Sequence, residues 1–166
     1  MRHSIAFVIV AILCGCATKY QSQGFTGGFT ETQLDKNVFR VSFQGNGFTR
    51  GERTEDMVLL RSAELAIKNN FTHFVIVDGS TKQDYSTFTT PVQSTTTANV
   101  NVYGNTAYGR ARTTTTGGDT MVIVKPSSTN TVVFFSSRPD VPGLVYDASF
   151  ICGSLGRKYE VTCGAN

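Results

Sequence analysis

Histidine and long apolar segments are both scarce in this sequence, and the two shortages exclude several functions at once. There are two histidines in 166 residues, and His3 lies at the extreme N-terminus. His73 is therefore the one candidate base for a serine or cysteine hydrolase, and no Gly-x-Ser-x-Gly elbow is present. Its place in an apolar segment favours a structural role. We therefore expect that the protein is not an enzyme. A hydrolase that uses His73 as its base is the least favoured function.

Charge is scarce as well. Fifteen basic and 12 acidic residues leave a formal net charge of +3, and the basic residues are dispersed. Nucleic-acid-binding domains cluster them instead. The glycines at 45–47 have no adjacent lysine, which a phosphate loop requires. No carboxylate has zinc-ligand spacing relative to the cysteines or His73. We therefore expect the protein to bind no nucleic acid, metal ion or cofactor.

The longest apolar run, residues 5–13, lies near the N-terminus after Arg2. As a helix, nine residues rise only about 14 Å, roughly half of a ~30 Å hydrocarbon core. A basic start, a short apolar run and a small residue at its end are typical of an export signal that is removed. We therefore expect residues 1–15 to be a signal peptide.

The end of this run, Leu13-Cys14-Gly15-Cys16, resembles the lipobox of bacterial lipoproteins. The resemblance implies that the Cys16 thiol is lipidated first. The chain is then cut before Cys16, which the small Gly15 permits, and the new amine is acylated, for example with palmitate. Two or more acyl chains anchor a protein stably. The alternative is an ordinary secretory signal with coincidental cysteines.

The residue after the lipobox cysteine is Ala17, and in the enterobacterial sorting pattern the absence of Asp at that position implies the outer membrane. We therefore expect a lipid-anchored outer-membrane protein whose body faces the periplasm or the cell surface. Without residues 1–15 the chain has 151 residues, enough for one small domain. In an oxidising compartment, Cys152 and Cys163 are expected to form a disulfide.

The pattern predicts an α+β domain over residues 37–166, mainly an antiparallel sheet, preceded by a tether over residues 16–36 whose glycines keep it extended or irregular. Residues 38–44 alternate as a half-buried strand. A long helix is expected over about 52–68, capped by Thr49 or Thr54 and ended by Asn69-Asn70, since Asn tolerates the left-handed conformation that ends helices. A central strand follows at 71–77. The order strand, helix, strand leaves open a parallel βαβ unit or a helix on an antiparallel sheet.

A Thr-rich insertion occupies about 81–120, and a turn at Gly104-Asn105 favours an exposed β-hairpin there over a disordered loop. Residues 121–125 and 131–135 predict a second hairpin. Asp147 is expected to cap a short C-terminal helix of about 12 residues, with Phe150 on its apolar face. A hairpin that spans the two C-terminal cysteines is the alternative.

Several segments resemble a family of small uncharacterised proteobacterial outer-membrane lipoproteins. They are 28–35, 37–41, 45–49, 61–66 and 71–74, with a weaker match at 147–159. The resemblance covers about residues 24–78, whereas the Thr-rich middle is individual to this chain. It implies a lipoprotein with an α+β domain and supplies no catalytic residues.

These observations predict a lipid-anchored envelope protein with a structural or interaction role and an envelope protein as partner. The alternative is a glycan or peptidoglycan binding module. Its contacts would be Tyr103, Tyr108, Arg110 and Arg112, which flank the expected turn. A solvated hairpin that carries two arginines is the other interpretation of these four residues.

Overall fold

The computed structural model of the protein describes residues 17–164. The predicted signal peptide and the predicted lipidation site, Cys16, lie outside the described residues. The chain forms two compact units. Of the described residues, one unit contains 17–84 and 124–164, and we call it the α+β unit; the other is Tyr85–Ile123, which we call the hairpin unit.

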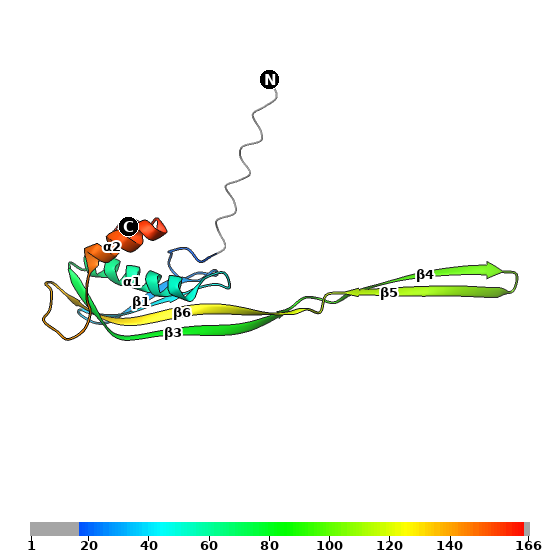
Figure 1. The fold of residues 1–166 in the computed structure, drawn as a ribbon, viewed down its shortest axis with the longest axis horizontal. Helices are drawn as coiled ribbons and strands as arrows, with labels where there is room; N and C mark the ends of the chain where they lie inside the picture. Colours follow the sequence, from blue (N-terminus) through cyan, green and yellow to red (C-terminus); the bar gives the residue numbers. More distant parts are fainter. Residues whose placement is uncertain (1–16, 165–166) are drawn as a thin grey trace, which may run out of the picture. The chain divides into compact units, whose positions relative to one another are not determined.

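The larger sheet has five strands in the order β1-β2-β6-β3-β7, and Figure 1 labels most of them. Their bounds are Gly28–Asp35 for β1, Val38–Gln44 for β2, Thr120–Phe135 for β6, His73–Thr89 for β3 and Val145–Asp147 for β7. The pairs β1-β2, β2-β6 and β3-β7 are antiparallel. The predicted α+β class with a mainly antiparallel sheet is confirmed.

Helix α1, Gly51–Lys68, packs on the sheet, and helix α2, Ala148–Tyr159, packs on α1 (Figure 1). The predicted alternation of β2 is confirmed, because Phe39, Val41 and Phe43 are buried. These side chains meet the buried face of α1, so the core of the α+β unit lies between helix and sheet. Its largest fully buried side chains include Phe43, Phe74, Phe134, Met57 and Leu60.

The connection from β2 through α1 to β3 decides between the two arrangements that the sequence left open, a parallel βαβ unit and a helix on an antiparallel sheet. Strand β6 is antiparallel to β2 and lies between β2 and β3. The N–H of Thr72, just before β3, donates to the carbonyl of Phe135 at the end of β6, 2.9 Å away. β3 therefore runs opposite to β6 and in the same direction as β2. The result is a split β-α-β arrangement, with an antiparallel strand between the two parallel ones.

The prediction of a second hairpin at 121–135 is wrong, since these residues form the single strand β6. The polar residues in its middle indicate a turn by composition, but they have partners across the sheet. Ser128 lies opposite Phe43 and shares a hydrogen bond of 2.8 Å with Thr54 of α1. The carbonyl of Pro126 accepts from the N–H of Gly45. Strand β3 is likewise longer than expected, continuing past residue 77 to Thr89.

The predicted tether also needs correction, because part of it, residues 28–35, is strand β1 of the sheet. Phe29 lies opposite Phe43 and is buried, and Tyr20 packs against the Phe29 ring at 4.9 Å. Thr18 is buried too. The glycines do not keep this stretch irregular. Instead, Gly28 takes a positive φ of 136° where an added Cβ would meet the carbonyl oxygen of Gln21 at 2.5 Å.

The ends of the helices follow the prediction in part. Neither Thr49 nor Thr54 caps α1, whose N-cap is Arg50 without a side-chain hydrogen bond. Asn70, with φ of 63°, ends α1 in the left-handed conformation, as expected. Asp147 caps α2 by accepting from the Phe150 N–H at 2.9 Å, which confirms the predicted start. The Phe150 side chain, however, is 72% exposed and not on the packed face of α2.

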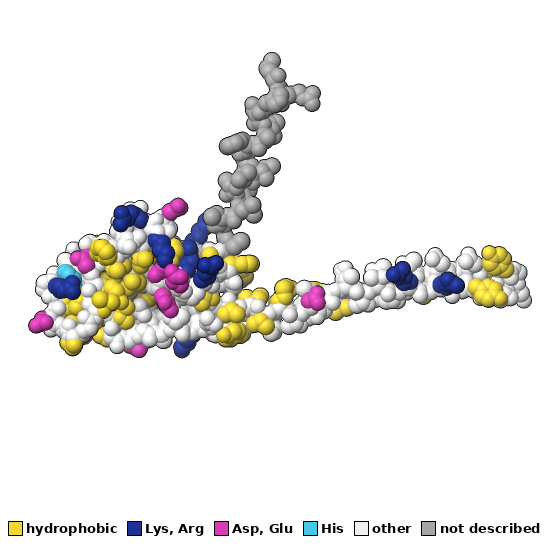
Figure 2. Space-filling view, viewed as in Figure 1, with side chains coloured by type: hydrophobic (Ala, Val, Ile, Leu, Met, Phe, Trp, Pro, Cys, Tyr) yellow, Lys and Arg dark blue, Asp and Glu magenta, His cyan; other side chains and the backbone are white. Residues whose placement is uncertain are grey.

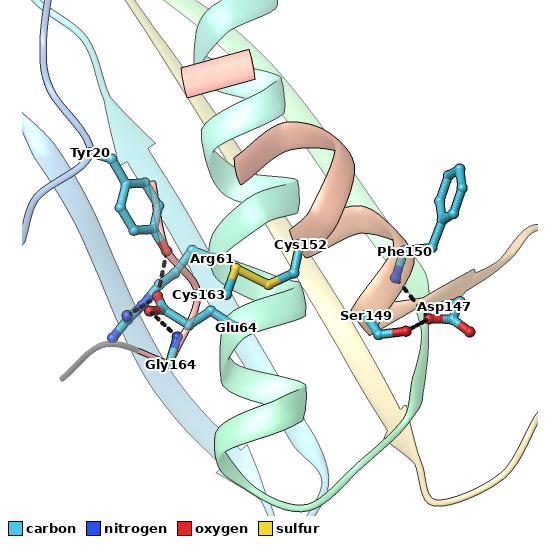
Figure 3. Close-up of a disulfide and its surroundings, with 9 residues drawn as sticks. All are labelled: Tyr20, Arg61, Glu64, Asp147, Ser149, Phe150, Cys152, Cys163 and Gly164. Carbon is cyan, nitrogen blue, oxygen red and sulfur yellow. Dashed lines mark hydrogen bonds and ion pairs between the residues drawn. A yellow bond between two sulfur atoms is a disulfide. The ribbon is translucent and has the colours of Figure 1, made fainter. Parts of the chain in front are cut away.

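The predicted disulfide between Cys152 and Cys163 is present, with 5.9 Å between the Cα atoms (Figure 3). Cys152 lies in α2, and Cys163 lies in the segment that follows the helix. The alternative hairpin between the two cysteines is therefore wrong. The bond ties the end of the described chain to α2.

Candidate functional site

The hairpin unit contains the four residues that the sequence proposes as ligand contacts. Strands β4, Gln93–Tyr103, and β5, Thr106–Thr116, form a two-stranded sheet in unbroken register, so the favoured hairpin is confirmed (Figure 1). At the turn, Gly104 has φ of 59°, which suits the first position of a type II′ turn. All 11 residues of β4 and all 11 of β5 are exposed.

The register puts the four proposed residues on one face. Tyr103 lies opposite Thr106, and the alternate residues of β5 after Thr106 are Tyr108, Arg110 and Arg112. Directly opposed residues share a face and successive residues alternate between faces. We call this the Tyr/Arg face, and its other members are Gln93, Thr95, Thr97, Asn99, Asn101, Thr106, Thr114 and Thr116. The sequence analysis identified these four residues but did not place them on one face. The two-residue turn, combined with the alternation of side chains along each strand, is the pattern that predicts this shared face.

The opposite surface, which we call the Val/Ala face, has a different character. Its cross-strand pairs are Val102 with Ala107, Val100 with Gly109, Ala98 with Ala111, Thr96 with Thr113 and Ser94 with Thr115. Hydroxyl contacts of 2.9 Å between Thr96 and Thr113 and 3.4 Å between Ser94 and Thr115 agree with this assignment. None of these ten residues is charged. The hairpin is therefore amphipathic, and sequence reasoning missed its apolar face.

The Tyr/Arg face offers two kinds of ligand contact, stacking on tyrosine rings and ion pairing with arginine side chains. Tyr103 and Tyr108 are 74% and 66% exposed, so their rings are accessible for stacking. Arg110 and Arg112 follow on β5 and are the only charged residues of the two strands. Figure 2 shows basic side chains along the hairpin and hydrophobic ones near its turn. Aromatic rings beside guanidinium groups suit an anionic or glycan-bearing surface.

In the α+β unit, His73 lies in a cavity of about 530 Å³ together with Thr72, Asp147 and Ser149. Its Nδ1 is 2.8 Å from the Thr72 hydroxyl, and its Nε2 is 4.0 Å from an Asp147 carboxylate oxygen. The Thr72 hydroxyl donates to the carbonyl of Ser136 at 2.9 Å. The Thr72 hydroxyl therefore lies between the His73 ring and the Ser136 carbonyl, within hydrogen-bond distance of both.

The other hydroxyl beside His73 is also occupied. Ser149 donates to an Asp147 carboxylate oxygen at 2.6 Å, and the same oxygen accepts the capping N–H of Phe150 (Figure 3). These two hydrogen bonds, that of Ser149 first, lower the pKa of Asp147. The arrangement is that of a helix N-cap.

A second charged group is buried where the two ends of the described chain meet α1. Arg61 and Glu64, both in α1, form an ion pair, and their side chains are 9% and 8% exposed. The Tyr20 hydroxyl donates to the same Glu64 oxygen at 2.5 Å, and the Gly164 N–H to the other oxygen at 3.4 Å (Figure 3). Arg61 also pairs with Glu31 of β1 at 2.7 Å.

The pKa shifts in this cluster follow from its contacts. Burial by itself raises the pKa of Glu64, but the hydrogen bonds from Tyr20 and Arg61 outweigh it and lower that pKa. Burial and the hydrogen bond to Glu64 raise the pKa of Tyr20. All the charged groups have partners, so the cluster holds β1, the N-terminal segment and the C-terminal segment on α1. It has a structural role and was not expected from the sequence.

Two carboxylates near the start of α1, Glu52 and Asp56, contact helix α2. Lys158 of α2 donates to Asp56 at 2.7 Å and to Glu52 at 3.2 Å, and these hydrogen bonds, that to Asp56 first, raise the pKa of Lys158. The Tyr159 hydroxyl also donates to Asp56. The contacts join the two helices at their surface.

Within residues 17–164, no group of three or more His, Cys, Asp or Glu side chains is placed to hold a metal ion. None of the helices in this described part is long and apolar enough to cross a membrane. In comparisons with known proteins, no family model, no curated protein and no solved structure matches this chain.

Proposed function

We propose that this protein is a lipid-anchored component of the bacterial cell envelope, held in the outer membrane through Cys16, and that it acts by binding an envelope protein. The observation that supports binding is the hairpin, which exposes every residue of both strands and pairs with no other strand of the described chain. Its binding surface for the partner is the Tyr/Arg face.

The physics of two-stranded sheets supports this proposal. An isolated hairpin is marginally stable in water, and three or more strands or a covering layer are normally needed. On the Tyr/Arg face, Tyr103 and Tyr108 are 74% and 66% exposed, and the apolar area of their rings is stabilised only when a bound molecule removes it from water. A hairpin of this length is therefore best accounted for as a surface that a bound molecule covers.

A non-enzymatic role is part of the proposal. Hydrolysis by a serine or threonine needs a base that accepts the proton of the nucleophile. The hydroxyls beside His73 donate to Ser136 and Asp147 instead. We expect His73→Ala to leave every cellular phenotype of the protein unchanged; a hydrolytic activity that this variant abolishes would overturn the assignment.

The anchor is tested by comparing two neighbouring cysteines. We expect Cys16→Ser to release the protein from the outer-membrane fraction and to leave its N-terminal peptide without acyl mass. Cys14→Ser is the matched control, because it changes the residue that the signal peptidase would discard. Membrane fractionation and mass spectrometry of the N-terminal peptide give the readout. Unchanged membrane association of Cys16→Ser would contradict lipid anchoring.

The binding role is tested by crosslinking in intact cells, followed by purification of the lipidated protein and mass spectrometry. We expect an envelope protein that is recovered with the parent chain and lost with the double variant Tyr103→Ser and Tyr108→Ser. Thr95→Ser with Thr114→Ser, on the same face and farther from the turn, is the control. Recovery of no partner, or equal recovery with both double variants, would refute the proposal.

Glycan binding is the second candidate, and the arrangement of the Tyr/Arg face favours it specifically. Two aromatic rings and two guanidinium groups on one surface match the apolar faces and carboxylates of peptidoglycan. Sedimentation of the protein with purified peptidoglycan is the test. We expect Arg110→Ala with Arg112→Ala to reduce co-sedimentation if this role holds, and unchanged sedimentation after deletion of residues 93–116 would exclude it.

A further inference from the structure

We propose that two copies of this chain pair through the Val/Ala faces of their hairpins, about a two-fold axis parallel to the strands. The inference deepens the proposed function: the Tyr/Arg face receives the partner, and the Val/Ala face receives a second copy. It rests on that function in one respect, because anchoring in a shared membrane concentrates the copies.

The first argument is the relief of the Val/Ala face, which is higher along one strand than along the other. On β4 it carries Val100 and Val102, and on β5 the residues directly opposite are Gly109 and Ala107. A Cβ added at Gly109 would lie 3.4 Å from a methyl carbon of Val100, so the valine stands beside an open strip. At these two pairs the face thus has a ridge on β4 and a trough on β5, whereas the other three pairs, Ala98 with Ala111, Thr96 with Thr113 and Ser94 with Thr115, have side chains of similar size on both strands.

A two-fold axis parallel to the strands makes this relief complementary to itself. The rotation places β4 of one copy over β5 of the other and leaves positions along the strands unchanged. Each residue therefore faces, in the second copy, the residue that is its cross-strand partner within its own hairpin. Val100 then faces Gly109 of the second copy, Val102 faces Ala107, and Ala98 faces Ala111. An axis perpendicular to the strands would put β4 over β4, with ridge against ridge.

The charge distribution favours pairing of two copies through the Val/Ala face over pairing through the Tyr/Arg face. The Val/Ala face has no charged residue, whereas the opposite face has Arg110 and Arg112. Pairing through the Val/Ala face buries no charge and leaves the guanidinium groups of both copies pointing away from each other, in water. Pairing through the Tyr/Arg face would bring four like charges together, which costs free energy.

The area of the Val/Ala face indicates that two copies pair in a shared membrane and not in dilute solution. Strands of 11 residues are about 36 Å long at ~3.3 Å per residue, and two strands are about 10 Å wide. Two such faces bury roughly 700 Å² in total, below the ~1,200 Å² of stable complexes formed from solution. The pair therefore needs a raised local concentration. A common membrane supplies it, and the parallel axis fits, because the chain enters and leaves both hairpins at the same end.

The test is site-specific crosslinking of the full lipidated chain in its own membrane. Facing sheets lie about 10 Å apart, so a bismaleimide with a spacer of that length is the reagent. We expect Val100→Cys to give a crosslinked dimer and the matched control, Asn101→Cys on the opposite face of the same strand, to give only the parent background. Two epitope tags on co-expressed chains identify a true pair of copies.

A disrupting variant completes the test. With Val102→Cys as the crosslinking position, we expect Val100→Lys to abolish the dimer, because it buries a charge in the interface, and Gly109→Val to abolish it by filling the trough. Asn101→Lys adds the same charge to the opposite face and is expected to leave the dimer unchanged. Labelling with a monofunctional maleimide verifies that each cysteine is accessible.

Three results would overturn the inference. They are the absence of a dimer with Val100→Cys, an adduct that contains a different protein or lipid, and equal crosslinking at Asn101→Cys. The inference and the proposed function fail separately. A dimer without capture of an envelope partner removes the proposed function alone, and capture that depends on Tyr103 and Tyr108 without a dimer removes this inference alone.

Discussion

The buried cluster around Arg61 offers a stability prediction that can be worked through from its contacts. Replacing Arg61 by Met keeps a long apolar side chain in place but removes the guanidinium that serves Glu64 and Glu31. Glu64 then keeps the Tyr20 hydroxyl and the Gly164 N–H as donors, but its charge, at 8% side-chain exposure, loses the Arg61 guanidinium. Glu31 is 32% exposed and can return to water.

The magnitude follows mainly from Glu64. Removing one partner of a buried ion pair costs about 3–5 kcal/mol, because an uncompensated charge stays behind. Loss of the contact between Arg61 and the Phe29 ring, at 4.1 Å, adds about 0.5–1 kcal/mol. For a domain of this size each kcal/mol lowers the melting temperature by roughly 2–4 °C, so we expect Arg61→Met to melt at least about 6 °C lower.

Urea and thermal denaturation at pH 7, followed by circular dichroism, measure this effect on protein produced without residues 1–16. The control is Arg157→Met, because Arg157 is exposed and its guanidinium donates to the Gly153 carbonyl within its own helix. We expect that control to change the unfolding free energy by no more than about 0.5 kcal/mol. A loss below about 1 kcal/mol for Arg61→Met would refute the assignment of a buried, structural charge cluster.

The cluster also predicts a pH dependence. Because the pKa of Glu64 is lowered in the folded protein, its contribution is fully present above the ordinary pKa of 4.5 and is lost as the pH falls through the folded value. Stability should therefore decrease on acidification below pH 4.5. We expect Glu64→Gln to be less stable at neutral pH and to lose stability less steeply in acid; an unchanged acid slope would contradict the shift.

Three further predictions concern α2 and the segment that follows it. Cys163→Ser should lower the unfolding free energy by about 2–3 kcal/mol, since the disulfide closes a loop with a sequence separation of 11; equal denaturation midpoints with and without reductant would contradict this. Asp147→Ala should cost about 1 kcal/mol through loss of the N-cap, measured by urea denaturation. Gly156→Ala should destabilise by about 1–3 kcal/mol, because its Cβ would lie 2.6 Å from the Val161 carbonyl oxygen, whereas Gly153→Ala, with open space, should be neutral or stabilising in the same assay.

Local patterns predicted those elements whose signal lies within a few residues. The alternation of β2, the length of α1, the stop at Asn70 and the cap at Asp147 each depend on neighbours in the chain, and each is found. The disulfide was predictable as well, because only two cysteines remain after the predicted signal and anchor.

The errors arose where a partner distant in the sequence decides the structure. Ser128 and its polar neighbours indicate a turn by composition, yet the hydroxyl of Thr54 and the backbone of β2 satisfy them within a strand. The glycines of residues 16–36 suggest a tether, yet Phe29 lies opposite Phe43 and residues 28–35 form an edge strand. A polar residue is tolerated in a sheet wherever its hydrogen bonds are met, and the local sequence does not contain that information.

The candidate site shows the same division. The sequence alone determined which residues the hairpin contains and where it turns, because a two-residue turn and β-favouring threonines act locally. Cross-strand register then decided that Tyr103, Tyr108, Arg110 and Arg112 share one face and that an uncharged Val/Ala face lies behind them. Tertiary structure alone revealed the Arg61–Glu64 cluster, since a charged pair enters a core only when hydroxyl, amide and carboxylate partners from distant segments compensate for its lost water.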